Sequence, residues 1–140
     1  MEDSSIKFTM LSRDSNTRLA GSAIRSICIA AGMNEEDASI TELALVEAIN
    51  NIIEHAYEDR PDGLVEFEFS HNSSEIIITL ADSGRPAELR DISLPAFDPA
   101  DIDSLPESGL GMHLIDMTMD NVERLRSGNR NILRMRKWKK

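Results

Sequence analysis

Residues 42–57, ELALVEAINNIIEHAY, are the most informative stretch of this sequence for both its fold and its function. At about 100° per residue, one face of a helix formed here would be polar. That face carries Glu47, Asn51, Glu54 and His55. The opposite face would be apolar, as in a helix packed on a core. It carries Leu45, Ala48, Ile49, Ile52 and Ala56. A carboxylate and an amide one turn apart suit a divalent cation bound to phosphate, or a base beside one. The alternative is the solvated face of an amphipathic helix.

Length and composition set the class of protein. With 140 residues, 41% of them hydrophobic, the chain suits a single domain over residues 1–140. A formal net charge of −10 argues against nucleic acid as a partner, since few cations are available to neutralise phosphates. The longest apolar runs are far too short to span a membrane, and the first residues lack a secretory pattern. With one cysteine, Cys28, in an apolar helical pattern, we expect a cytoplasmic protein with a core thiol.

The hydrophobic pattern predicts the order strand, helix, helix, strand, strand, loop, helix, strand, strand. The expected strands are residues 6–11, 65–69, 75–81, 122–126 and 132–136, and the expected helices run from a cap at Asp14 or Ser15 to Gly32, from Asn34 to about Glu58, and over residues 110–119. Trp138 is expected to pack at the end of the last strand, with contact to a partner protein as the alternative. This order suits an α+β fold, a two-layer sandwich with a mixed or antiparallel sheet and helices on one face.

Two short motifs flank a long segment rich in proline. ADSGRP, residues 81–86, follows the central strand and can place a carboxylate at the floor of a pocket with backbone close by; an Asx-type turn is the simpler interpretation. SGLGM, residues 108–112, opens a helix, where free N–H groups and the positive end of the helix dipole suit a phosphate. A plain capping turn is the alternative there. So long a loop between them is usually functional or mobile.

Taken together, these motifs resemble the Bergerat-fold ATP-binding superfamily of gyrases, histidine kinases and mismatch-repair ATPases. Within it, the chain is most similar to the small bacterial anti-sigma-factor serine kinases. The resemblance covers roughly residues 8–135 and is carried by VEAINNIIEHAY, ADSGRP, FDP, GLGMHLI and NILRM.

The resemblance implies a role for each matching residue. Glu47 matches the general base that orients or deprotonates the serine hydroxyl of a protein substrate. Asn51 matches the ligand of the Mg²⁺ that bridges the ATP phosphates, and His55 follows in the same motif. Asp82 matches the acceptor of a hydrogen bond from the adenine amino group, and Gly84 would allow close approach. The phosphates would lie on Ser108, Gly109, Leu110, Gly111 and Met112. Residues 85–108 would form an ATP lid whose closure excludes water.

The function implied by the resemblance is an ATP- and Mg²⁺-dependent serine protein kinase and anti-sigma factor. It would phosphorylate an anti-anti-sigma antagonist and sequester a sigma factor in a partner switch, as a homodimer. The acidic lid keeps an alternative open, a nucleotide-gated protein-binding module with little or no turnover. No Lys or Arg lies between Arg90 and Arg124, and Glu107 stands where kinases of this family have a basic residue. Unless Arg85, Arg90 or a partner's arginine supplies a cation, we expect slow phosphoryl transfer.

Overall fold

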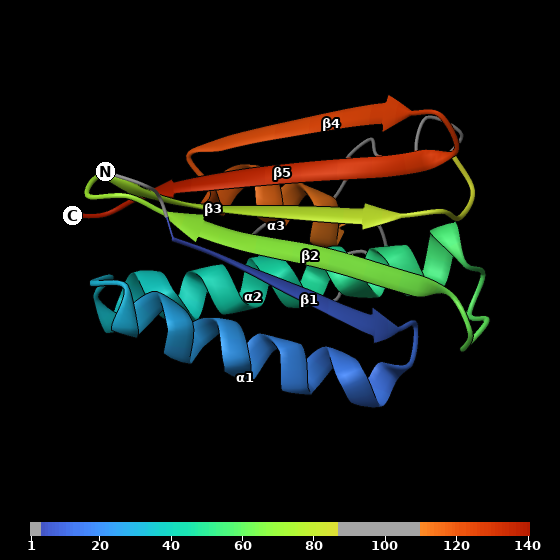
Figure 1. Cartoon of the computed structure of the whole chain (residues 1–140), viewed down its shortest axis with the longest axis horizontal. Coiled ribbons are helices and arrows are strands. Elements are labelled where there is room, and N and C mark those ends of the chain that lie inside the picture. The colour runs from blue at the N-terminus through green and yellow to red at the C-terminus, as the bar shows by residue number, and fades with distance from the viewer. Residues whose placement is uncertain (1–3, 87–109) are drawn as a thin grey trace, which may run out of the picture.

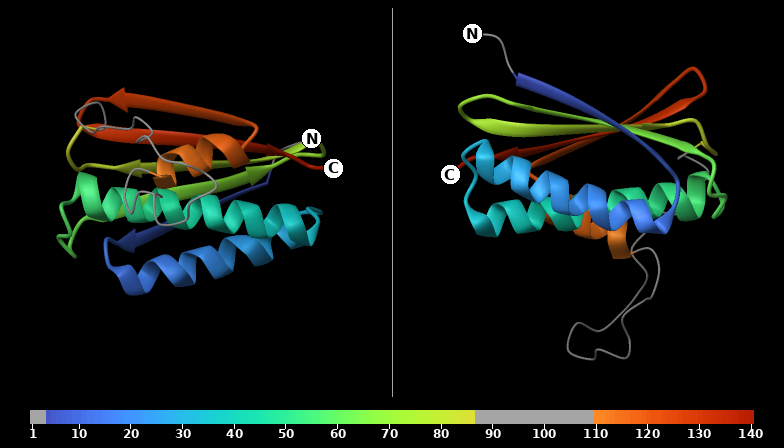
Figure 2. Two further views of the ribbon diagram at one scale, coloured as in Figure 1. Left: turned by 180° about the vertical axis from the view of Figure 1, so that it is seen from behind. Right: turned by 60° about the horizontal axis from the view of Figure 1, so that its bottom comes forward.

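A computed structural model describes residues 4–86 and 110–140, which form an antiparallel sheet with helices on one face (Figures 1 and 2). The sheet has five strands in the order β1-β2-β3-β5-β4. The strands are β1 (Ser4–Leu11), β2 (Leu64–His71), β3 (Glu75–Asp82), β4 (Asn121–Ser127) and β5 (Arg130–Trp138). The helices are α1 (Asp14–Ala30), α2 (Glu35–Asn51), a π-helical turn η1 (Ile52–Ala56) and α3 (Leu110–Thr118). The predicted α+β fold and element order are confirmed.

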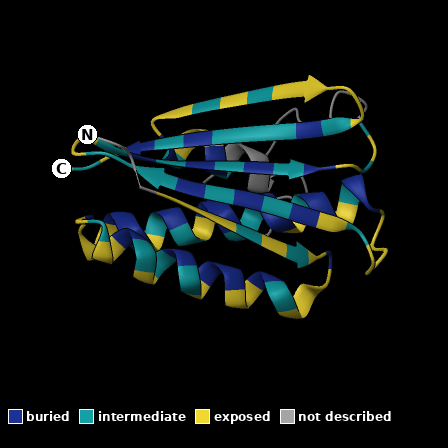
Figure 3. Cartoon of the chain, in the orientation of Figure 1, coloured by how far each residue is buried: buried dark blue, intermediate teal, exposed yellow. Residues whose placement is uncertain are grey.

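The core lies between the sheet and the helices, and the strand pattern explains why (Figure 3). Successive side chains of a strand point to opposite faces, so the alternating residues of β2 and β3 divide between core and solvent. Val65, Phe67 and Phe69 of β2 are buried, whereas Glu66 and Glu68 between them are half-buried on the other face. The β3 strand lies at the centre of the sheet, between β2 and β5, as its β-branched composition predicts.

The α1 helix packs against α2 through its apolar face, with Ile24 and Cys28 fully buried. The expected cap at Asp14 or Ser15 is wrong, because Arg13 occupies the N-cap position and makes no side-chain cap. Asp14 instead lies in the first turn, where a negative charge is favoured by the helix dipole. The predicted stop is confirmed: Gly32 has φ +101°, which glycine adopts at little cost.

The second helical segment begins as predicted but does not continue as one α-helix. Asn34 caps α2 by accepting a hydrogen bond from the Asp37 backbone N–H at 2.8 Å. After Asn51 the pattern changes to a π-helical turn, in which the Tyr57 N–H donates to the Ile52 carbonyl at 2.9 Å. The predicted helical face of four polar residues is therefore continuous only as far as Asn51. Glu58 follows with a positive φ of 52°, and this left-handed residue ends the segment.

The last elements form the predicted helix and hairpin. The β4–β5 turn contains Gly128 with φ +59°. Lys137 of β5 is buried and its Nζ donates to the Thr118 carbonyl at the end of α3, at 2.9 Å. Trp138 is 58% exposed, so the expectation that it packs is wrong: the alternation that turns Lys137 inward turns Trp138 outward. Within residues 4–86 and 110–140, no helix is long and apolar enough to cross a membrane.

Candidate functional site

Asp82 ends the central strand β3 with its side chain toward the helices. It is 3% exposed, and its Oδ1 accepts hydrogen bonds from the Gly84 N–H at 3.0 Å and from Asn131 Nδ2 at 2.8 Å. The hydrogen bond from the Gly84 N–H, two residues after Asp82, forms the Asx-type turn that was the simpler interpretation of this motif. The same contacts hold a buried carboxylate at the end of a strand, so the two interpretations of ADSGRP are compatible.

The turn after Asp82 contacts the helical segment that carries the polar residues. A Cβ on Gly84 would lie 2.4 Å from the Ala56 carbonyl oxygen, so glycine is needed for the two backbones to approach. The Arg85 N–H donates to that same oxygen at 2.8 Å. The two motifs, far apart in sequence, therefore meet at one end of the molecule, where β3 ends beside η1 (Figure 1, right-hand side).

The side chain of Tyr57 supports this turn through hydrogen bonds. Tyr57 was not identified from the sequence as a functional residue. Its hydroxyl donates to the Leu64 carbonyl at 2.6 Å and accepts from the Ser83 N–H at 2.9 Å. Burial raises the pKa of Tyr57, and the hydrogen bond from Ser83 opposes that rise. Gly63 allows this packing, because a Cβ there would lie 2.5 Å from the Tyr57 ring. With the Asp82 and Ala56 contacts, every N–H from residue 83 to 85 is hydrogen-bonded within the chain.

Asn131, on the neighbouring strand β5, is a second residue that sequence reasoning missed. It is 5% exposed, and its Nδ2 donates to Asp82 Oδ1 and to the Arg85 carbonyl, each at 2.8 Å. Its Oδ1 accepts from Arg126 Nη1 on β4 at 2.8 Å. The sequence offers only a partial signal, because Asn131 starts the apolar run NILRM at an inward position; its pairing in register with Asp82 is visible only in the sheet.

Glu47, Asn51 and His55 lie along the helix, and all three are half-buried. Glu47 lies one α-helical turn before Asn51, the last residue of α2, which packs between α1 and α3. His55 belongs to η1, and its Nε2 lies 3.8 Å from Glu54 Oε2 at the surface. The structure thus keeps Glu47 and Asn51 at the predicted spacing and puts His55 in a differently wound segment.

The predicted phosphate-binding residues are only partly covered by the structure. Ser108, Gly109 and residues 87–108 of the predicted lid lie outside the described residues. Leu110, Gly111 and Met112 form the first turn of α3, which packs on α2. The predicted helix is confirmed from Leu110 onward, while a role in binding phosphate stays a prediction.

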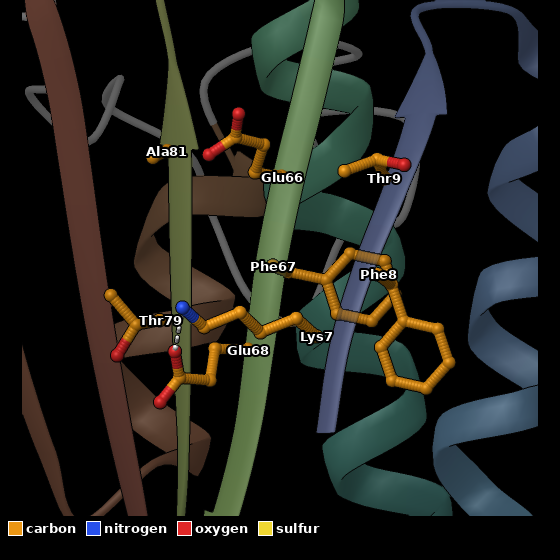
Figure 4. Close-up of a pocket in the computed structure, with 8 residues that line it drawn as sticks. All are labelled: Lys7, Phe8, Thr9, Glu66, Phe67, Glu68, Thr79 and Ala81. Carbon is orange, nitrogen blue, oxygen red and sulfur yellow. Dashed lines mark ion pairs between the residues drawn. The ribbon is translucent and has the colours of Figure 1, made fainter. Parts of the chain in front are cut away.

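A separate hollow of about 340 Å³ involves the β1–β2 edge of the sheet (Figure 4). It includes the stacked rings of Phe8 and Phe67, whose centroids lie 4.7 Å apart, and the pair of Lys7 Nζ and Glu68 Oε2 at 3.8 Å. Lys7 is exposed, so water screens this ion pair and it contributes little. Of the predicted site residues that the structure describes, none lines the hollow. The buried carboxylate with its preorganised turn is therefore the better candidate site.

Comparison with known proteins gives concordant results. Residues 10–137 match the histidine kinase-like ATPase domain. The serine-protein kinase RsbW of Oceanobacillus iheyensis is 32% identical over 95 residues, which are 66% of this chain and 60% of that protein. The anti-sigma F factor of Clostridium beijerinckii is 26% identical over 123 residues, 88% of this chain and 85% of that protein. The crystal structure of the RsbU and RsbW domains of a Mycobacterium tuberculosis protein shares the fold. Its TM-score is 0.66 at 11% identity, covering 98% of this chain and 33% of that one.

Proposed function

The chain belongs to the family of histidine kinase-like ATPase domains, and from that premise we propose that it binds ATP with Mg²⁺ and phosphorylates a serine of an anti-anti-sigma protein. The names of the similar proteins, a serine-protein kinase and an anti-sigma F factor, support this activity. They also support a sigma factor as the second partner, sequestered in a partner switch. We include a homodimer in the proposal, as the sequence resemblance implies.

The observation that carries the proposal is the contact between Gly84 and Ala56. It puts the turn that presents Asp82 directly against the segment that continues from Asn51. The buried Asp82 carboxylate is thus presented by a turn that packs on η1, and η1 directly continues the helix that ends with the Asn51 amide. Such a pair is what a ligand with an amino group at one end and a metal-bound phosphate chain at the other would need.

The described residues fit the group that the family implies. Because Oδ1 of Asp82 already accepts two hydrogen bonds, the adenine amino group would donate to the other carboxylate oxygen. The amide oxygen of Asn51 is a hard ligand of the kind that Mg²⁺ prefers. When bound, the metal and nucleotide supply the phosphoryl group and neutralise charge that develops on its oxygens.

Glu47 is the proposed general base. It lies one turn before Asn51 on the same helix, so a serine hydroxyl brought to the metal-bound phosphates would come within reach of its carboxylate. Orienting that hydroxyl and accepting its proton is worth about 10²- to 10⁴-fold in rate. Positioning by the partner protein would supply the rest of the rate enhancement.

The test is transfer of label from γ-labelled ATP, with Mg²⁺, to an antagonist protein encoded near this chain. Glu47→Gln is expected to lower label transfer by at least about 100-fold, since the base is lost, with ATP affinity unchanged. Asn51→Ala is expected to lose Mg²⁺-dependent ATP binding. Glu54→Gln is the matched control, because Glu54 is exposed on η1 and pairs only weakly with His55. Label transfer by Glu47→Gln at the wild-type rate would exclude Glu47 as the base.

The acid-rich segment between Arg90 and Arg124 favours a second candidate, a binding module that uses ATP as a gate. In that case the wild-type protein would bind ATP tightly and capture the sigma factor, yet transfer no label. Absence of both ATP binding and label transfer would contradict both candidates.

A further inference from the structure

We propose that Arg126 of β4 determines the base specificity of this site, by fixing which end of the Asn131 amide faces Asp82. With Arg126 in place, Asn131 holds the Asp82 carboxylate in a fixed orientation, in which it accepts the amino group of adenine and rejects the carbonyl that replaces it in hypoxanthine. The inference rests on the proposed ATP-binding function and adds to it a residue outside every predicted motif.

The orientation of Asn131 follows from the chemistry of Arg126. The two residues pair across the β4–β5 ladder, and Arg126 Nη1 lies 2.8 Å from Asn131 Oδ1. A guanidinium has donors only, so it can be met only by the amide oxygen. The NH₂ end of Asn131 must then point the other way, toward Asp82 Oδ1 and the Arg85 carbonyl. Because Asn131 is 5% exposed, bulk water offers little substitute for either contact.

The Asp82 carboxylate can only accept hydrogen bonds, and the Asn131 amide helps to fix how it is presented to a ligand. The Asn131 amide and the Gly84 N–H both donate to Oδ1, and these two bonds fix the plane of the carboxylate. The ligand would then meet the other carboxylate oxygen, which is an acceptor. The 6-amino group of adenine is a donor and satisfies it. The 6-oxo group of hypoxanthine is an acceptor, so two acceptors would face each other. Sites built to bond one such group reject the wrong partner strongly, because buried polar atoms are left unpaired.

Reversal of the amide would undo this arrangement. It would turn Oδ1 of Asn131 toward the Asp82 carboxylate and the Arg85 carbonyl, which are both acceptors. A lysine at position 126 is still a donor and holds the amide as arginine does. A glutamate there is an acceptor, so it draws the NH₂ end of Asn131 toward itself and away from Asp82. Arg126 is exposed, so replacing it opens no cavity in the core.

The experiment is calorimetric titration of the full chain with ATP and with ITP, in the presence of Mg²⁺. The two nucleotides carry the same phosphate charge, so a change of charge at position 126 cancels in the ratio of their affinities. We expect the wild type to prefer ATP, R126K to keep that preference within about twofold, and R126E to reduce it at least about tenfold, which is about 1.4 kcal/mol. R134E is the matched control, because Arg134 contacts Thr79 Oγ1 at 3.4 Å on the outer face of the sheet.

The outcomes separate this inference from the function on which it rests. If the wild type binds no ATP, the proposed function fails and the inference with it. If the wild type prefers ATP and R126E keeps the wild-type ratio, the function stands and the role of Arg126 is overturned. Should R126E fail to fold, R126M, which only removes the donors, is expected to reduce the preference about threefold. An unchanged ratio in R126M would then overturn the inference.

Discussion

Replacing Gly84 with alanine tests how closely the Asp82 turn packs on the helical segment. The new Cβ would lie 2.4 Å from the Ala56 carbonyl oxygen, 2.6 Å from its carbon and 2.8 Å from its Cβ. Two of these atoms are backbone, so one of the two segments must shift. Overpacking of this kind costs about 1–3 kcal/mol, and loss of the hydrogen bond from Arg85 to the same oxygen adds about 1 kcal/mol. We expect Gly84→Ala to lose about 3 kcal/mol and to melt about 10 °C below the wild type.

The assay is thermal unfolding with and without Mg²⁺-ATP, alongside titration of ATP. Gly128→Ala is the matched control, because Gly128 has φ +59° but no neighbour within 4 Å of a new Cβ. Its left-handed backbone should cost about 1–2 kcal/mol without any loss of ATP affinity. Gly84→Ala should lose ATP affinity as well as stability, because the turn that presents Asp82 moves. A melting point within about 2 °C of the wild type would refute the packing argument, and unchanged ATP affinity would refute its link to the site.

Two further predictions concern buried hydroxyl and thiol groups. Tyr57→Phe removes the hydroxyl that joins the Leu64 carbonyl to the Ser83 N–H, so it should cost about 1–2 kcal/mol in urea unfolding and weaken ATP binding. An unchanged free energy of unfolding would contradict a stabilising role for these two hydrogen bonds. Burial raises the pKa of Cys28 from 9.0 to about 12, so the folded state favours the neutral thiol, and stability is lost as pH rises above the unfolded value. Relative to Cys28→Ala, the wild type should lose about 2 kcal/mol between about pH 8.5 and pH 10.5, and a pH-independent difference would contradict this burial.

Much of the fold could be predicted because its signals are local. The alternation in β2 is visible within eight residues, and the Asn34 cap and the Gly32 stop depend on the nearest few. The contact of Gly84 with Ala56 shows in addition that the ADSGRP turn packs against the end of the polar helical segment. In each case the residue type is required by the local backbone or by the face it occupies.

The π-helical turn and the role of Asn131 could not be predicted in the same way. The spacing of apolar residues fits an α-helix as far as Ala56, so it does not reveal the change to a π-helical turn after Asn51. Tyr57, which follows that turn, is hydrogen-bonded to Leu64 and Ser83, and such contacts with later parts of the chain cannot be inferred from apolar spacing. Asn131 lies 49 positions from Asp82, and their contact exists only because β5 pairs with β3 in one register. Propensity and periodicity carry no information about such pairings until the sheet order is known.

Titration of Mg²⁺-ATP into the wild type and Asp82→Asn shows whether the Asp82 carboxylate accepts a hydrogen bond from the adenine amino group. The donors from Gly84 and Asn131 require an oxygen at Oδ1, so the substituted amide would turn its NH₂ group toward the adenine amino group. Two donors would then oppose each other where one hydrogen bond to a charged group had formed, a change of about 1.5–3 kcal/mol. We expect ATP to bind the wild type and to bind Asp82→Asn about 10- to 100-fold more weakly. Equal ATP affinity for the two proteins would contradict this role of Asp82.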